Sequence, residues 1–199
     1  MRTPAEQAEG LYQIFEEHGA ELYWLAYLLT GDPEQGFAAF TRSLNFEDSA
    51  NPVFRGFMIS WARKLIIGEA LSGIRPQLRD SLRRLQTEPW RHGPLPSEAF
   101  AVRPGVDRAE FERAVLAIDV FPRCAVLLTV FERLSVTQAA LLLNTHVDLV
   151  KQAQRRGLIE LTRNLAIGRG WDPSSAKNEI RVKNLRSVLG PLAWPTCTT

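Results

Sequence analysis

Three basic residues, Lys151, Arg155 and Arg156, fall close together in the stretch LVKQAQRRGLIEL. Lysine and arginine bind phosphate oxygens through charge-assisted hydrogen bonds, so this spacing suits contact with a nucleic-acid backbone. A charged run of this kind is also common on an ordinary solvated helix face. The pattern alone therefore leaves both interpretations open.

The residues that most often perform catalysis are scattered along the chain. His18, His92 and His146 are far apart, and none stands beside a serine or a cysteine in the sequence. No phosphate-binding glycine loop is present either. We therefore expect no enzymatic activity, no catalytic residue and no cofactor.

The two cysteines do not have the spacing of a metal site. Cys124 and Cys197 lie far apart, with no CxxC pair and no disulfide framework. We expect Cys124 to be a small buried thiol and Cys197 a free thiol in the tail, with no bound metal.

Charge is distributed unevenly, although the net charge is only +2. Acidic residues dominate residues 1–50, whereas basic residues gather in 55–91 and again in 151–186. Such segregation suits a protein that binds an acidic polymer with one face and another protein with a second face. No apolar run approaches the roughly 18 residues of a membrane-spanning helix, and MRTPAEQAEG is not a secretory signal. We expect a cytoplasmic protein without membrane insertion.

Helices must position these residues, because apolar side chains recur at spacings of three and four and no convincing strand pattern occurs. The fold class is therefore all-α. Gly31 ends one expected helix, and Asp32 with Pro33 opens the next. Helices are expected over residues 9–30, 33–44, 53–71, 77–85, 108–118, 122–131 and 136–143, then from Thr145 or His146 to about residue 166, with a short basic helix over 174–189.

A proline-rich stretch, TEPWRHGPLPSEAFAVRPGVD, separates two groups of these helices. Its composition predicts an extended linker over residues 87–107. We therefore expect two small helical domains, 8–86 and 108–167, and a C-terminal extension over 168–199.

The second domain contains a candidate helix-turn-helix. Ser135 can cap the first helix, and Asn144 suits a left-handed turn residue between the helices. The second helix would then leave its charged residues facing a DNA groove. The expected inward positions are Ala139, Leu142, Leu143, Val147, Val150, Leu158 and Leu161.

This order of residues resembles the C-terminal domain of bacterial RNA polymerase sigma factors. That family has a proline, an apolar run, an aromatic residue, a Leu-Ser pair, a bracing helix, a turn and a Thr-Val-Lys core. The stretches LYQIFEEHGAELYWLAYLLTGDPE and FRGFMISWARKLI are similar to the N-terminal domain of the same family. Two such domains without a middle one resemble the extracytoplasmic-function type. The matching C-terminal positions are Pro122, Leu127 to Val130, Phe131, Leu134, Ser135, Ala140, Leu143, Val150 and Lys151.

The resemblance implies a protein that binds RNA polymerase core and promoter DNA, with an anti-sigma factor as a further partner. The C-terminal domain would read the −35 element through Thr145, His146, Asp148, Lys151, Gln152, Arg155 and Arg156. The N-terminal domain would read the −10 element through Phe46, Ser49, Asn51, Arg55, Arg63 and Lys64. The second helix would hold the polymerase through Gln35, Phe37, Ala38, Thr41 and Arg42.

Several positions depart from the family pattern at the partner surfaces. Phe37, Ala38 and Arg42 replace acidic residues of the second helix, and Ala153 replaces an arginine of the recognition helix. Fewer basic contacts predict weaker and less salt-sensitive DNA binding. For His146, a helix cap or a solvated side chain is an alternative to a DNA contact.

These departures leave a second functional class open. A sigma-like protein-interaction module could keep the fold after losing polymerase or promoter binding. In that case Phe37 and Phe40, or the tail after Gly168, would contact another protein. Core packing is the corresponding alternative for Phe46 and Trp61.

Overall fold

The structure, a computed structural model, describes the backbone of residues 4–44, 55–90, 93–96 and 105–174, and their side chains except those of 4–14 and 55–58. Eight α-helices and one π-helical segment occur in these ranges, and none of the described residues forms a strand. The all-α prediction is confirmed for this part of the chain. The expected helix over 174–189 lies almost entirely outside it.

The chain divides into two compact units, residues 1–76 and 77–199. The sequence placed the domain boundary later, with the first domain ending at residue 86. The difference is a helix, α4 (Arg75–Thr87), most of which belongs to the second unit. The residues that α4 contacts in that unit are distant in sequence, so helical periodicity could not show to which unit α4 belongs.

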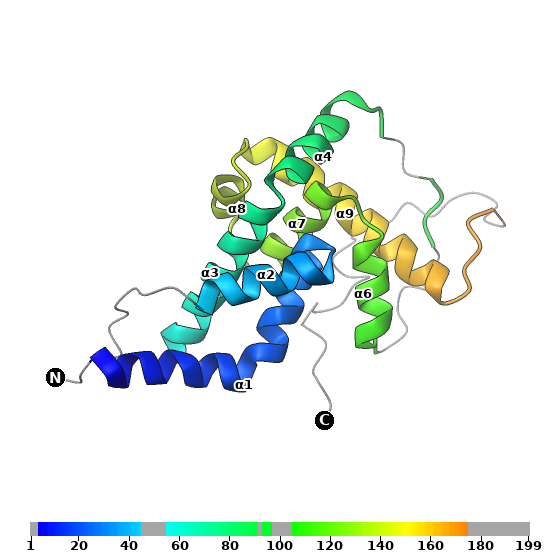
Figure 1. The fold of residues 1–199 in the computed structure, drawn as a ribbon. Helices are drawn as coiled ribbons and strands as arrows, with labels where there is room; N and C mark the ends of the chain where they lie inside the picture. The colour runs from blue at the N-terminus through cyan, green and yellow to red at the C-terminus, as the bar shows by residue number, and fades with distance from the viewer. Residues whose placement is uncertain (1–3, 45–54, 91–92, 97–104, 175–199) are drawn as a thin grey trace. The chain divides into compact units, whose positions relative to one another are not determined.

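The first unit consists of α1 (Pro4–Thr30), α2 (Pro33–Leu44) and α3 (Arg55–Gly73), each of which packs against the other two (Figure 1). Gly31 ends α1 with a φ of 77° and donates its N–H to the Tyr27 carbonyl at 2.7 Å. The Asp32 carboxylate accepts the Gln35 N–H at 2.8 Å and caps α2. The predicted boundary between these helices is confirmed, whereas α1 begins five residues before the expected residue 9.

The core of the first unit forms where the apolar rows of its helices meet. Gly36 permits the closest approach, because a β-carbon there would lie 2.9 Å from the Tyr27 α-carbon. This contact holds α2 tightly against α1. The buried apolar side chains include Phe15, Leu22, Leu25, Leu29, Ala39, Ala62, Ile66 and Ala70.

The second unit is built around one long helix, α9 (Val147–Gly168). Three shorter helices pack on it: α6 (Arg108–Leu116), α7 (Val120–Val126) and α8 (Val136–Leu142). The predicted helix over 122–131 is instead α7 followed by a π-helical segment, Leu127–Phe131. This wider turn places Thr129 so that its hydroxyl accepts the Gln154 amide of α9 at 2.9 Å.

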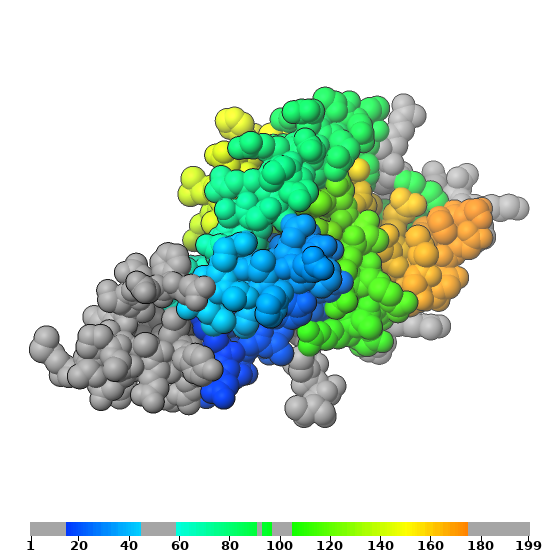
Figure 2. All heavy atoms as spheres, viewed as in Figure 1, coloured from blue at the N-terminus to red at the C-terminus, as the bar shows by residue number. Residues whose placement is uncertain are grey.

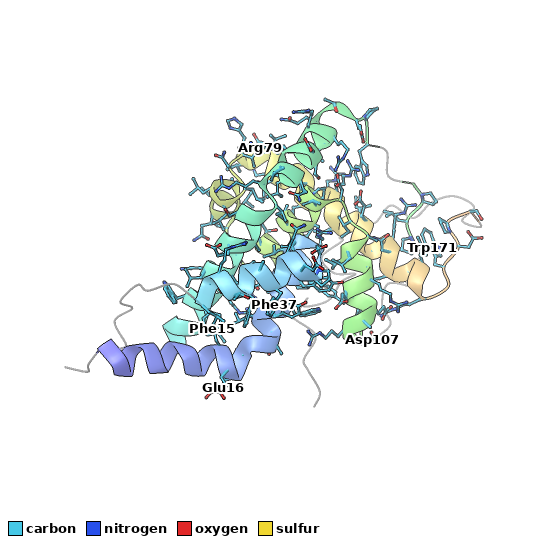
Figure 3. The ribbon with its side chains drawn as sticks, in the orientation of Figure 1. Phe15, Glu16, Phe37, Arg79, Asp107 and Trp171 are labelled. Carbon is cyan, nitrogen blue, oxygen red and sulfur yellow. The ribbon has the colours of Figure 1, made fainter. Side chains whose placement is uncertain are left out.

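Packed residues of the second unit occur beyond residue 167, where the sequence placed its boundary. Arg169 forms an ion pair with Glu110 at the start of α6. Trp171, labelled in Figure 3, is 8% exposed and donates its backbone N–H to the Ala166 carbonyl. The first residues of the predicted extension therefore pack against the helical unit.

In the described ranges, none of the helices is both long and apolar enough to span a bilayer.

Candidate nucleic-acid interface

A tight turn joins α8 to α9. Asn144 has a φ of 51°, the left-handed conformation expected from the sequence. Its N–H is donated to the Leu141 carbonyl, and the Thr145 N–H is donated to the Ala140 carbonyl at 3.0 Å. Together these bonds form a Schellman motif, which satisfies the last carbonyls of α8 and fixes where the chain leaves that helix.

The first helix of the pair begins with a capping box. The Ser135 hydroxyl accepts the Gln138 N–H, and the Gln138 side chain accepts the Ser135 N–H at 2.9 Å. The predicted cap is confirmed. These two reciprocal bonds stabilise a helix only seven residues long, which is otherwise marginal.

The bracing face of α8 differs from the prediction at one position. Ala139 and Leu143 are buried as expected, and Ala140 completes the face. Leu142 is 41% exposed, as is its neighbour Leu141 at 77%, so the prediction that Leu142 points inward is wrong. The buried positions Ala139, Ala140 and Leu143 are related as i, i+1 and i+4, so the inward face of α8 is rotated toward Ala140 and Leu142 lies outside it.

The N-terminal half of α9 exposes one polar row. Asp148 and Arg155 each lie three and four residues from Lys151 and Gln152, and the same face becomes buried at Ile159 and Thr162. The exposed part is therefore confined to about two turns, or roughly 10 Å, which is close to the width of a DNA major groove. The exposed row consists of Asp148, Lys151, Gln152 and Arg155.

Two cations of this row remain available to an anion. Lys151 lies 3.3 Å from Asp148, but both side chains are well exposed, at 61% and 92%. Such a surface pair contributes little and can be exchanged for a phosphate. Arg155 is exposed and forms no ion pair with any described acidic residue.

Arg156, by contrast, interacts within the protein. Its guanidinium lies 2.8 Å from Glu160, and its side chain is only 16% exposed. The same group lies over the Trp90 ring, 5.7 Å from the ring centroid. The structure thus separates Arg156 from Lys151 and Arg155, with which the sequence had grouped it. The aromatic partner comes from the linker, which sequence spacing did not connect to α9.

His146 occupies the N-cap position of α9 but makes no side-chain capping bond. The capping alternative for this residue is therefore not observed, and the imidazole is exposed. Thr145 is half-buried, and its N–H is committed to the turn. The first amides of α9 consequently lack a side-chain acceptor from His146, and the Asp148 carboxylate is the negative charge in the first turn of this helix.

Comparison with known proteins identifies no family. No protein-family model, no curated protein and no solved structure matches this chain.

Neither a metal site nor a reactive thiol accompanies this surface. Among the described residues, no three metal-ligating side chains lie together. Burial raises the pKa of the Cys124 thiol to about 12, so it stays protonated and unreactive. The expectation that Cys124 is buried is confirmed, whereas Cys197 lies outside the described residues.

The predicted −10 contacts in the first unit are only partly described. Phe46, Ser49 and Asn51 lie outside the described residues, and Arg55 begins α3 with its side chain undescribed. Arg63 is half-buried, 3.7 Å from Glu21. Lys64 is exposed. Trp61, for which core packing was the alternative, is half-buried.

The predicted polymerase-binding residues lie on α2. Phe37 is 62% exposed, with its ring edge-on to Tyr23 at a centroid distance of 6.5 Å. Arg42 forms an ion pair with Glu69 of α3 at 2.9 Å, which reduces its value as a contact for an acidic partner. Gln35 and Thr41 are exposed, and Ala38 is half-buried.

Proposed function

We propose that this chain is a sigma-factor-like protein that binds promoter DNA and RNA polymerase core in the cytoplasm and acts in transcription initiation. The observation that carries the proposal is the exposed row of α9, which follows directly on the Schellman turn at Asn144. A helix braced in this way can insert its first turns into a major groove, as in the helix-turn-helix of DNA-binding proteins. The sequence resemblance supplies the polymerase and an anti-sigma factor as partners.

The charges of this row set the expected strength of binding. Lys151 and Arg155 are its two cations, and each phosphate contact contributes about 0.9 to the slope of log affinity against log salt. Gln152 lies between them and can donate to a base edge. We expect weak, moderately salt-dependent binding by α9 alone, with polymerase supplying the remaining affinity.

The second candidate is a sigma-like module that binds another protein. The adjacent exposed side chains of Leu141 and Leu142 on α8 favour it, because contiguous apolar groups on a surface often mark protein contacts. This candidate predicts complex formation without promoter-dependent transcription.

Transcription from a promoter library, with core polymerase and the full chain, tests the proposal. Arg155→Gln should lower transcript yield and reduce the salt slope of DNA binding by about 0.9. Arg113→Gln is the matched control, because it removes the same charge from an exposed position on α6.

The two candidates differ in their outcomes. If the chain directs no transcript and fails to co-elute with core polymerase on gel filtration, the sigma-like proposal is wrong. If the chain elutes with polymerase but Arg155→Gln and Arg113→Gln behave alike, α9 is not the DNA contact.

A further inference from the structure

Helix α4, expected from the sequence over residues 77–85, exposes two rows of side chains that differ in charge. One row alternates in charge and turns toward α7. The next row consists of arginines alone, spaced four residues apart. The mixed row is Asp80, Arg84 and, just beyond the end of the helix, Glu88, and the arginine row is Arg75, Arg79 and Arg83.

Arg84 of the mixed row and the buried face of α4 attach this helix to the rest of the second unit. Arg84 donates to both carboxylate oxygens of Asp119, at 2.8 and 3.3 Å. The buried Ser81 hydroxyl accepts the Phe121 N–H at 2.9 Å, and Leu78 and Leu85 are buried beneath the helix. These contacts determine which side of α4 faces outward.

The arginine row is on that outward side. Arg79 and Arg83 are exposed, and neither forms an ion pair with a described acidic residue. Figure 2 shows α4 at the surface, and Figure 3 labels Arg79 on it. Asp80, the one acidic residue within α4, belongs to the other row and forms no ion pair with Arg79 or Arg83.

We propose that Arg79 and Arg83 form a second contact with the phosphate backbone of duplex DNA, in addition to α9. This inference rests on the proposed function. The two α-carbons lie about 6 Å apart along the helix axis, so both guanidinium groups can reach one strand. Arginine suits this role because its planar group binds a phosphate through two parallel hydrogen bonds.

The test measures binding of the full chain to a mixed-sequence DNA duplex across a salt series. Arg79→Gln and Arg83→Gln should each reduce the slope of log affinity against log salt by about 0.9, and the double variant by about 1.8. Arg113→Gln, on α6, is the control and should leave the slope unchanged. Glutamine and arginine have similar helix propensities, so unchanged thermal unfolding should accompany the loss.

A charge-preserving variant separates charge from geometry. Replacing Arg79 and Arg83 together by lysine should keep the salt slope, because slope depends on charge, and should weaken affinity by losing the paired hydrogen bonds.

The outcomes separate this inference from the proposed function. If the α4 double variant keeps the wild-type slope while Arg155→Gln lowers it, the inference is overturned and the α9 contact stands. If the α4 variant lowers the slope and Arg155→Gln does not, α4 binds DNA and the α9 assignment is wrong. If the wild-type chain does not bind the duplex at low salt, both are overturned.

Discussion

Gly157 of α9 packs directly against Pro122 of α7. A β-carbon at position 157 would lie 2.7 Å from the Pro122 carbonyl oxygen and 2.6 Å from a methyl group of Val126. The two helices therefore cross at a point that only a glycine fits without displacement. The contact lies two residues beyond Arg155, the last exposed residue of the polar row.

Gly157→Ala should destabilise the second unit by about 1–3 kcal/mol, because the added methyl group overpacks a rigid backbone contact. Denaturant unfolding of the full chain measures the change. Gly168→Ala is the matched control in the same helix, since no atom lies within 4 Å of a β-carbon there. A control that loses as much stability as Gly157→Ala would contradict the packing explanation.

His146→Ser should stabilise α9 by about 1 kcal/mol, because serine can accept an amide hydrogen bond that the imidazole does not make. Thermal unfolding is the measurement. Ser135→Ala, which removes the observed cap of α8, should lower stability by a similar amount. Equal unfolding temperatures for wild type and His146→Ser would show that the first amides of α9 are already satisfied.

Acid should weaken the attachment of α4 through Asp119. Burial opposes ionisation of this carboxyl, but hydrogen bonds from Arg84, Ser81 and the Val120 amide outweigh it and hold the pKa below its ordinary value of 3.8. The folded state thus binds fewer protons than the unfolded chain. The contribution to stability is complete above the ordinary pKa and is lost as pH falls through the lowered one.

Unfolding of Asp119→Asn across an acid pH series measures this dependence. The variant should be less stable than wild type near neutral pH, and its free energy of unfolding should fall less steeply below about pH 4. Arg84→Gln, which removes the main partner, should flatten the same part of the curve. An unchanged acid limb in both variants would mean that other carboxyl groups control acid unfolding.

Sequence alone determined the features that depend on short-range bonding. The boundary at Gly31 and Asp32, the cap at Ser135 and the left-handed turn at Asn144 each involve partners within five residues. Such bonds follow from residue type and spacing, so they could be read before any packing was known. The helical period of the apolar residues likewise gave the all-α fold.

Only the tertiary structure decided which basic side chains are available to bind a partner. Trp90, from a distant segment, lies against the Arg156 guanidinium, whereas the adjacent Arg155 stays exposed. Asp119, far along the chain from Arg84, attaches α4 to the second unit. These outcomes depend on which segments meet in space. A guanidinium group that contacts a carboxylate or an aromatic ring in the folded chain no longer offers its full charge to a partner. Contacts between distant segments cannot be predicted from the spacing of residues in the sequence.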